Sequence, residues 1–116
     1  MEYSQEMRVI FLSLLLAAAS FAADITGTWN FSVNTPAGNG SPTFVFKQTG
    51  EKLTGTYTGY FGSAELQGTV KGDDVEYSFT TQNGKVVYKG KVAGTTMKGT
   101  VKLDELGEGT FEGSKK

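Results

Sequence analysis

ITGTWNFSV, from Ile25 to Val33, is the stretch that decides the fold, because apolar and polar residues alternate along it. Isoleucine, glycine, tryptophan, phenylalanine and valine occupy every second position, and threonine, asparagine and serine stand between them. This period of two is typical of a strand with one buried face and one solvated face. The stretch holds the only tryptophan of the chain, Trp29, two residues after Gly27, and a near copy follows in LTGTY at 53–57.

The same alternation continues to the end of the chain and predicts roughly eight strands. Turn residues such as Thr49-Gly50 and Asn83-Gly84 separate the strands, and Asn-Gly is a strong signal for a two-residue hairpin. Only 35–42, TPAGNGSP, is expected to form a longer loop. The large side chains on the predicted inward face are Trp29, Phe31, Val33, Phe44, Phe46, Leu53, Tyr57, Phe61, Leu66, Val70, Val75, Tyr77, Phe79, Val86, Tyr88, Val92, Met97, Val101, Leu103 and Phe111.

Short turns between consecutive strands predict antiparallel neighbours, and closure of such a meander removes its exposed edges. We therefore predict an all-β fold, an eight-stranded antiparallel up-and-down β-barrel, with a β-sandwich as the alternative. A membrane barrel would turn the apolar face toward lipid. Short connections at both ends and lysines on the polar face, which would crowd a narrow lumen, argue against membrane insertion of the domain.

Glycine is frequent, and all 16 glycines follow residue 26, many of them on the apolar face inside strands. A glycine inside a regular element costs about 0.5–1 kcal/mol relative to alanine, so this pattern needs a physical reason. We interpret the inward glycines as bend points that let the strands curve enough for a small barrel to close. The alternative is that a missing side chain opposite an aromatic residue leaves space for a pocket.

The beginning of the chain does not follow the strand pattern. Val9 to Ala19 is an apolar run that follows Arg8 and precedes small residues, as in a secretory signal peptide cleaved after Ala22. The run is shorter than the roughly 20 residues of a membrane-spanning helix, and a buried or anchoring helix is the alternative. We predict a helical signal peptide over 1–22, with Met7 as a candidate start. A single β-barrel domain over 23–116 would then be exported to the periplasm or the cell exterior, as in a bacterial protein.

The charges are balanced from residue 23 onward, with ten lysines, ten carboxylates and no arginine. This balance gives no electrostatic reason to expect nucleic acid as a partner. Cysteine is absent from the chain, so the domain depends on its apolar core and not on disulfides. A strip of lysines could attract an acidic partner, although a solubilising outer face is the simpler interpretation. The strip consists of Lys89, Lys91, Lys98 and Lys102.

The sequence lacks the residues that most catalytic and metal sites use. Histidine and cysteine are absent, which removes the usual metal ligands, triads and thiol nucleophiles. The carboxylates fall on the predicted solvent face or in turns, without the burial that general acid catalysis requires. Asp73 and Asp74 could contribute to a calcium site, but about six oxygen ligands are needed, and a solvated turn is the simpler interpretation. We therefore predict no enzyme activity, no cofactor and no metal.

ITGTW, followed by LTGTYTG at 53–59, resembles the two opening hairpin strands of the avidin and streptavidin group. More broadly, the chain is similar to the calycin superfamily, which includes lipocalins and fatty-acid-binding proteins and whose barrels open with a Gly-x-Trp strand. The resemblance implies a barrel that binds a small molecule, with the indole of Trp29 plugging one end. It also implies that Tyr57 matches the tyrosine that hydrogen-bonds the ureido oxygen of biotin in that group.

The other biotin contacts of that group are not matched. Gly59 stands where the group has a ligand-binding serine, and Phe31 stands where it has an asparagine. The tryptophans that line the biotin cavity from later strands are missing, because Trp29 is the only one in the chain. The resemblance therefore implies the fold and a binding barrel, but not biotin as the ligand.

Aromatic side chains dominate the predicted inward face, and a buried phenol needs a hydrogen-bond partner from backbone, water or a ligand. We predict a non-catalytic barrel that binds a small apolar or amphipathic molecule at one barrel end. The alternative is a filled barrel whose aromatics are plain core. It would act through its surface as an inhibitor, adhesion or assembly module, with a protein partner or a second copy. The candidate ligand-binding residues are Trp29, Phe31, Phe44, Tyr57, Phe61, Tyr77 and Tyr88.

Overall fold

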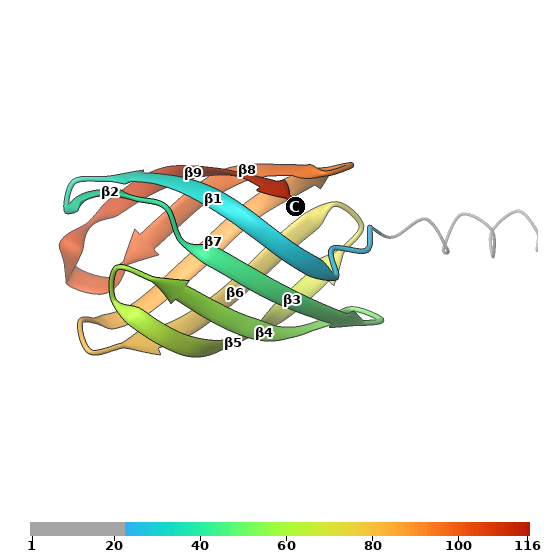
Figure 1. Ribbon diagram of the computed structural model, residues 1–116, viewed down its shortest axis with the longest axis horizontal. Coiled ribbons are helices and arrows are strands. Elements are labelled where there is room, and N and C mark those ends of the chain that lie inside the picture. The colour runs from blue at the N-terminus through green and yellow to red at the C-terminus, as the bar shows by residue number, and fades with distance from the viewer. Residues whose placement is uncertain (1–22) are drawn as a thin grey trace, which may run out of the picture.

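The computed structural model describes residues 23–116, and the predicted signal peptide over 1–22, with its candidate start at Met7, lies outside them. Most of the described residues are in strands (Figure 1). Among them there is no helix with the length and hydropathy of a membrane span. The elements are β1 (Gly27–Thr35), β2 (Gly38–Gly40), β3 (Thr43–Thr49), β4 (Lys52–Gly59), β5 (Gly62–Lys71), β6 (Asp74–Thr81), β7 (Gly84–Ala93), β8 (Thr96–Leu103), the 3₁₀ turn η1 (Asp104–Leu106) and β9 (Glu108–Lys115).

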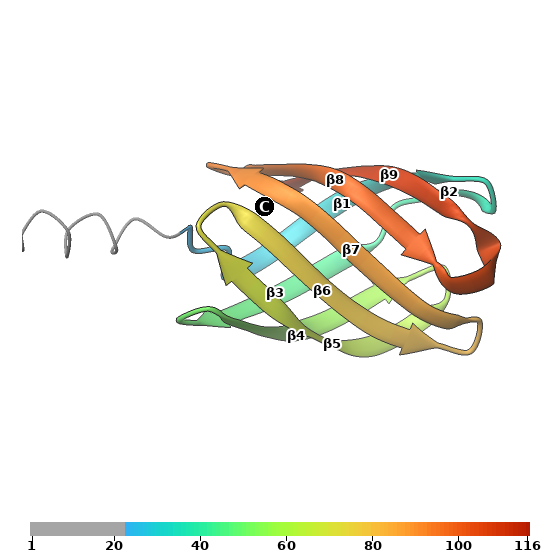
Figure 2. The ribbon, with the colours of Figure 1, turned by 180° about the vertical axis from the view of Figure 1, so that it is seen from behind.

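The strands form one antiparallel sheet that closes on itself. From β3 to β9 each strand pairs with its neighbours in chain order, and β1 pairs with β3 along one edge and with β9 along the other. Figures 1 and 2 show the resulting barrel from the front and from behind. The closure confirms the predicted antiparallel up-and-down barrel.

The segment 35–42, predicted as a longer loop, is a tight hairpin instead. Thr35 pairs with Gly38, so the turn itself contains only Pro36 and Ala37. The proline ring sets the φ angle that the first turn position needs. The chain therefore reverses here without the additional residues of a loop.

β2 and β3 together make one barrel strand. Both pair with the same edge of β1 in the same register, since Val33 pairs with Gly40 and Thr28 pairs with Val45. The interruption between them includes Pro42, which has no backbone N–H for the ladder. The barrel therefore has the predicted eight strands, one of which is divided into two segments.

The turn predicted at Asn83-Gly84 is displaced by one residue. Thr81 pairs with Gly84, so the turn residues are Gln82 and Asn83, and Gly84 begins β7. The hydroxyl oxygen of Thr81 accepts a hydrogen bond from the N–H of Asn83 at 3.1 Å. The same hydroxyl donates to the carbonyl of Gly84 at 3.3 Å. These two bonds close the turn one residue earlier than the Asn-Gly pair predicts.

The interior of the barrel is filled by the inward side chains that the alternation predicts. All of that set are buried except Phe61, which lies in the β4–β5 turn and is half-buried. Ile25, which precedes β1, is buried with them. Every strand of the barrel wall except the short β2 thus contributes one face to a single core, as period-two patterning requires.

Two glycines show why the walls of this small barrel need positions without side chains. A Cβ at Gly55 would run into the carbonyl of Val45 on the neighbouring strand. A Cβ at Gly99 would run into the carbonyl of Lys89 and lie 2.5 Å from the Cα of Gly90. Neighbouring backbones approach more closely here than a side chain allows. These two glycines therefore permit the close approach of neighbouring strands, and their interpretation as bend points stays a prediction.

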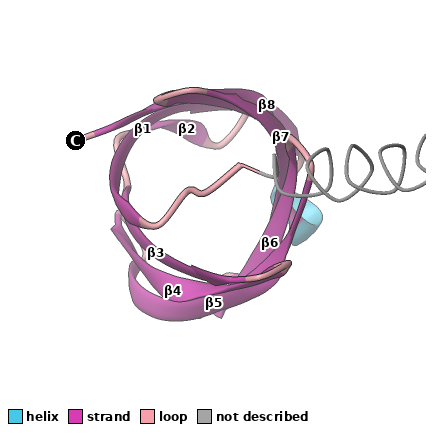
Figure 3. Ribbon diagram, turned by 90° about the vertical axis from the view of Figure 1, so that its right-hand side faces the viewer, coloured by secondary structure: helices cyan, strands magenta, loops and turns pink. Residues whose placement is uncertain are grey.

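One end of the barrel is closed by the residues that precede β1. Figure 3 looks along the barrel, and the loop that leads into β1 crosses the ring of strands. Ile25 is fully buried, and its carbonyl accepts a hydrogen bond from Nε1 of Trp29 at 2.9 Å. Gln48 holds the loop, since its Oε1 accepts from the N–H of Ile25 at 2.9 Å and its Nε2 donates to the carbonyl of Ala23 at 2.7 Å. Ile25 and Trp29 therefore plug this end.

Candidate functional site

The opposite end of the barrel is open and contains a pocket of about 340 Å³. It lies among the β1–β2, β4–β5 and β6–β7 turns and the β8–β9 connection that contains η1. Its volume is near the lower end of the roughly 300–1,000 Å³ found for small-molecule sites. The inward side chains that line it are Val33, Tyr57, Phe61, Phe79, Val86, Tyr88 and Leu103. The rim is formed by residues 37–42 with Thr35, Tyr60, Asn83 and Leu106.

The mouth stays open because the β4–β5 hairpin separates from its neighbouring strands at this end. Within residues 23–116, β2 pairs with β1 only, and the ladder between β3 and β4 ends at Thr58. The ladder between β5 and β6 ends at Gln67, so residues 62–66 of β5 have no partner strand on that side. Residues 59–66, which we call the β4–β5 tip, are thus unpaired with both neighbouring hairpins.

Tyr57 fastens the β4–β5 tip from inside the barrel. Its hydroxyl oxygen accepts a hydrogen bond from the N–H of Phe61 at 3.2 Å. A Cβ at Gly59 would lie only 2.7 Å from that oxygen and 2.9 Å from the ring carbon that carries it. Glycine at position 59 therefore leaves room for the tyrosine side chain beneath the tip, and the tip places Phe61 at the pocket.

Tyr88 lies deeper, on β7, and packs among other rings. It stacks on Tyr77 with ring centroids 5.0 Å apart, and its ring centroid is 6.0 Å from that of Phe79. Burial, and to a smaller extent the nearby Tyr57 phenol, raises the pKa of Tyr88 well above its usual range. The hydroxyl is therefore protonated at neutral pH and is able to donate a hydrogen bond.

No charged residue is among the described residues that line the pocket. The polar side chains are hydroxyls and amides, supplied by the tyrosines and by Thr35, Asn39, Ser41 and Asn83. An ion moved into such a site would lose hydration without gaining a counter-charge. The site therefore suits an uncharged molecule with a large apolar part.

The structure divides the seven candidate residues between the pocket and the core. Tyr57, Phe61 and Tyr88 line the pocket. The remaining four are packed in the interior and are no more than 3 % exposed: Trp29, Phe31, Phe44 and Tyr77. Other aromatic rings pack around these four side chains. The four residues therefore lie beneath the pocket and do not form its wall.

Several residues that line the pocket are not singled out by the sequence. Phe79, Val86 and Leu103 belong to the inward pattern, but only the folded barrel shows that they meet at one mouth. Tyr60 and Leu106 have no signal of this kind, because the first is a turn residue that is 91 % exposed and the second lies in η1. The alternation of apolar and polar residues could have identified Phe79, Val86 and Leu103. Nothing in the sequence pattern identifies Tyr60 or Leu106.

Tyr77 has a buried hydroxyl without a hydrogen-bond partner in the part of the chain that the structure describes. Burial raises its pKa strongly, and Tyr88 adds a smaller effect in the same direction. An unpaired buried hydroxyl costs about 1–3 kcal/mol. The ring of Tyr77 thus stabilises the core by packing while its hydroxyl works against it.

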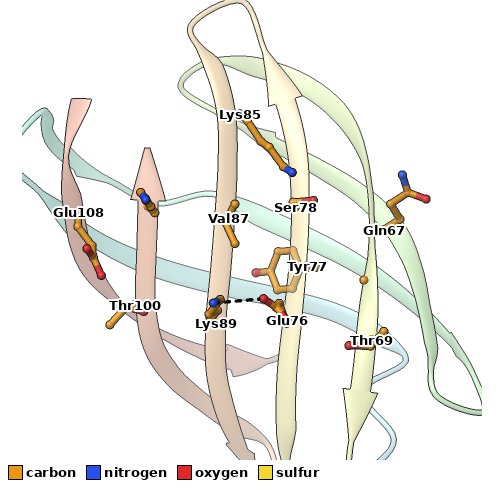
Figure 4. A pocket seen from close by; sticks show the side chains of 12 residues that line it. Gln67, Thr69, Glu76, Tyr77, Ser78, Lys85, Val87, Lys89, Thr100 and Glu108 are labelled. Carbon is orange, nitrogen blue, oxygen red and sulfur yellow. Dashed lines mark ion pairs between the residues drawn. The ribbon is translucent and has the colours of Figure 1, made fainter. Parts of the chain in front are cut away.

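The outer face of β5 to β9 carries a second hollow of about 510 Å³, which Figure 4 shows from close by. Most of its side chains are polar and of both charges, with Lys85 and Lys89 on the same face as Glu76 and Glu108, and Val87 and Tyr77 also line it. Nζ of Lys89 lies 3.4 Å from Oε1 of Glu76, and both side chains are more than half exposed. An exposed pair of this kind contributes little to stability.

Carboxylates flank the predicted lysine strip on both sides. Nζ of Lys91 lies 2.6 Å from Oδ1 of Asp74 on β6, and Lys102 is the register partner of Glu108 on β9. The strip therefore lies within a face of mixed charge. Among residues 23–116, no group of three or more acidic, histidine or cysteine side chains is placed to hold a metal ion.

The comparisons with known proteins address the fold and leave the ligand open. No protein-family model matches the sequence, and a search of the curated proteins found no match. Among solved structures, the chain is similar to a de novo designed protein described as a fluorescence-activating β-barrel, with a TM-score of 0.57 and 15% identity. The match covers 85% of this chain and 97% of the designed one. The class of protein is thus a small closed antiparallel β-barrel, and the resemblance to the avidin and calycin families stays an expectation.

Proposed function

We propose that this protein is an exported, non-catalytic β-barrel that binds one small, mostly apolar molecule at its open end. The observation that carries the proposal is the pocket of about 340 Å³ bounded by Tyr57, Phe61 and Phe79. Export rests on the signal-peptide pattern over 1–22, and the non-catalytic role rests on a sequence without histidine or cysteine. The site would need neither a cofactor nor a metal.

The distribution of packing supports binding at this end. The interior is filled around Trp29, Phe31 and Phe44, which are almost wholly buried, and the plug at the closed end is held by hydrogen bonds. Space is left above Tyr57 and Tyr88, where aromatic and aliphatic side chains surround it. A site that is mostly apolar with a few polar groups is the usual form of a small-molecule pocket.

The alternative proposal is a barrel that acts through its surface on a protein partner or a second copy. It draws support from two apolar side chains at the rim, Tyr60 and Leu106, which are 91 % and 41 % exposed. Both residues also line the pocket, so they fit ligand binding equally well. A measurement that fills the pocket separates the two functions, because a surface module does not need the space.

The test uses a neutral fluorescent probe, 6-propionyl-2-(dimethylamino)naphthalene, and two matched valine substitutions. Val86→Phe adds a ring inside the pocket, whereas Val45→Phe makes the same change at a side chain that is 46 % exposed on the outer face of β3. We expect saturable binding with a blue shift of the probe for the unaltered protein and for Val45→Phe. Binding to Val86→Phe should weaken about tenfold or more, because the added ring occupies the site.

Circular dichroism of both variants provides the control for folding. The probe's own emission is the readout, because Trp29 lies in the closed end and its indole is buried there. Non-saturable binding to the unaltered protein would contradict the proposal, and so would equal affinity for a folded Val86→Phe variant.

A further inference from the structure

We propose that the pocket selects a neutral aromatic molecule that carries a hydrogen-bond acceptor, such as a carbonyl oxygen, and that the Tyr88 hydroxyl binds this acceptor. The inference rests on the proposed function and narrows it to a chemical class and one specificity-determining residue. Three properties of the pocket, as residues 23–116 form it, support this inference: its lining has no charged side chain, its walls are aromatic, and the Tyr88 hydroxyl is a hydrogen-bond donor without a protein acceptor.

Neutrality of the ligand follows from the segregation of charge in the barrel. Lysine, aspartate and glutamate side chains lie on the outer face and in turns, and none lines the pocket in the part of the chain described. A carboxylate or ammonium group placed there would be desolvated without a partner. The same pocket would accept an uncharged group of equal size.

The preference for an aromatic ligand follows from the four inward rings that line the pocket, with Tyr60 at its rim. Tyr57 and Phe79 stack with centroids 4.3 Å apart and an interplanar angle of 17°. Phe61 lies at the pocket from the β4–β5 tip, and Tyr88 from β7. Aromatic pairs gain about 0.5–1.5 kcal/mol beyond the area they bury, so a planar unsaturated ligand gains more here than an aliphatic one.

The acceptor on the ligand follows from comparing the three inward phenols. The hydroxyl oxygen of Tyr57 accepts the N–H of Phe61, which fixes this phenol at the β4–β5 tip although its O–H can still donate, and the hydroxyl of Tyr77 is buried outside the pocket. Tyr88 lines the pocket, and its hydroxyl makes no hydrogen bond within residues 23–116. A donor at the wall of an apolar site favours a ligand that carries an acceptor, because a ligand without one would displace water from the donor and leave it unpaired.

The experiment compares three molecules of nearly equal shape by displacement of the naphthalene probe. 2-Acetonaphthone is neutral with an acceptor, 2-isopropenylnaphthalene is neutral without one, and 2-naphthoate is charged. We expect the ketone to bind about five- to tenfold more tightly than the alkene, as one neutral hydrogen bond allows. The carboxylate should bind most weakly because it must lose its hydration.

The assignment to Tyr88 is tested by three phenol-to-phenyl substitutions. Tyr88→Phe should bring the ketone-to-alkene ratio close to one. Tyr77→Phe, the matched control outside the pocket, and Tyr57→Phe should keep the ratio above threefold. The comparison of ketone and alkene in the unaltered protein keeps the test valid even if a variant fails to fold.

Each outcome decides either this inference or the proposed function beneath it. A ketone preference that disappears only in Tyr88→Phe supports the assignment. Equal binding of ketone and alkene, tight binding of naphthoate, or a ratio that survives Tyr88→Phe overturns the inference while leaving ligand binding in place. Failure of all three molecules to displace the probe overturns the inference, and failure of the probe itself to bind overturns the proposed function.

Discussion

Gly90 and Gly99 face each other across β7 and β8, and their pairing shows how single residues shape this barrel. A Cβ at Gly99 would meet both the Lys89 carbonyl and the Cα of Gly90. Gly90 also faces an aromatic side chain, since a Cβ at this position would lie 2.7 Å from the Phe111 ring. Glycine and aromatic side chains thus complement each other inside the wall, and neither could be enlarged without moving the other.

Substitution of Gly99 tests this requirement for close approach. We expect Gly99→Ala to lower the free energy of unfolding by about 1–3 kcal/mol, because the added methyl group forces the β7 backbone to move. Gly40→Ala is the matched control, since nothing lies within 4 Å of a Cβ at that position, and its effect should stay within about 0.5 kcal/mol. Urea unfolding of the two variants measures the difference, and equal stability would contradict the close-approach explanation.

At the scale of elements, the hairpins differ in how firmly their ends are held. β7 pairs with the whole length of β8 from Val86 to Ala93, whereas β5 loses its β6 partner beyond Gln67. The β4–β5 tip is held by its own two strands and by the Tyr57–Phe61 hydrogen bond. Local opening takes less free energy where fewer backbone groups are paired with neighbours.

Hydrogen exchange measures this difference between elements. We expect backbone amides of residues 62–66 to exchange at least tenfold faster than those of residues 67–70 on the same strand, since only the latter face a paired β6. Tyr57→Phe removes the acceptor of the Phe61 N–H and should accelerate exchange of that amide further. Amides of β7 and β8 serve as the internal reference, and uniform protection along β5 would rule out a loosely held tip.

At the scale of the whole molecule, the barrel is closed at one end and open at the other. The closed end is formed by Ile25, Trp29 and Gln48, and at the open end the β4–β5 hairpin separates from its neighbours beside the pocket. Between them lies a core in which tyrosines are the only ionisable side chains among residues 23–116. The stability of the molecule at high pH therefore depends on keeping buried phenols protonated.

Alkaline unfolding tests the burial of these phenols. The pKa values of Tyr77 and Tyr88 are raised in the folded state, so below about pH 10 both states hold the protons and the phenols add no pH dependence. Above that pH the unfolded chain releases protons that the folded protein retains. The free energy of unfolding should then fall by up to about 1.4 kcal/mol per pH unit for each tyrosine.

Urea titrations between about pH 8 and 11 follow this loss of stability. Tyr77→Phe removes one of the two phenols and should reduce the alkaline slope by about half. The same variant should be as stable as the unaltered protein or more stable at neutral pH, because it deletes an unpaired buried hydroxyl. An unchanged slope would show that Tyr77 is accessible to solvent in the folded state.

The amino-acid pattern predicted the barrel and its core because side-chain alternation is a local property. It placed Phe44, Val75 and Val101 on the inward face, and the structure buries all three. It was wrong about the longer loop over 35–42, because the rigid turn at Pro36 and the shared register of β2 and β3 depend on pairing with β1. It selected Tyr57 and Tyr88 as candidates but could not separate them from Trp29 or the other core aromatics.

The sequence by itself determined which face of each strand is apolar, where most chain reversals occur and which chemical groups are available. Hydrophobic periodicity and turn chemistry are encoded within a few neighbouring residues, so no partner strand is needed to detect them. Only the tertiary structure decided which barrel end is plugged, where the ladders end and which phenols line the pocket. Those properties depend on distances between residues far apart in the chain, such as Ile25 with Gln48 and Phe79 with Tyr57.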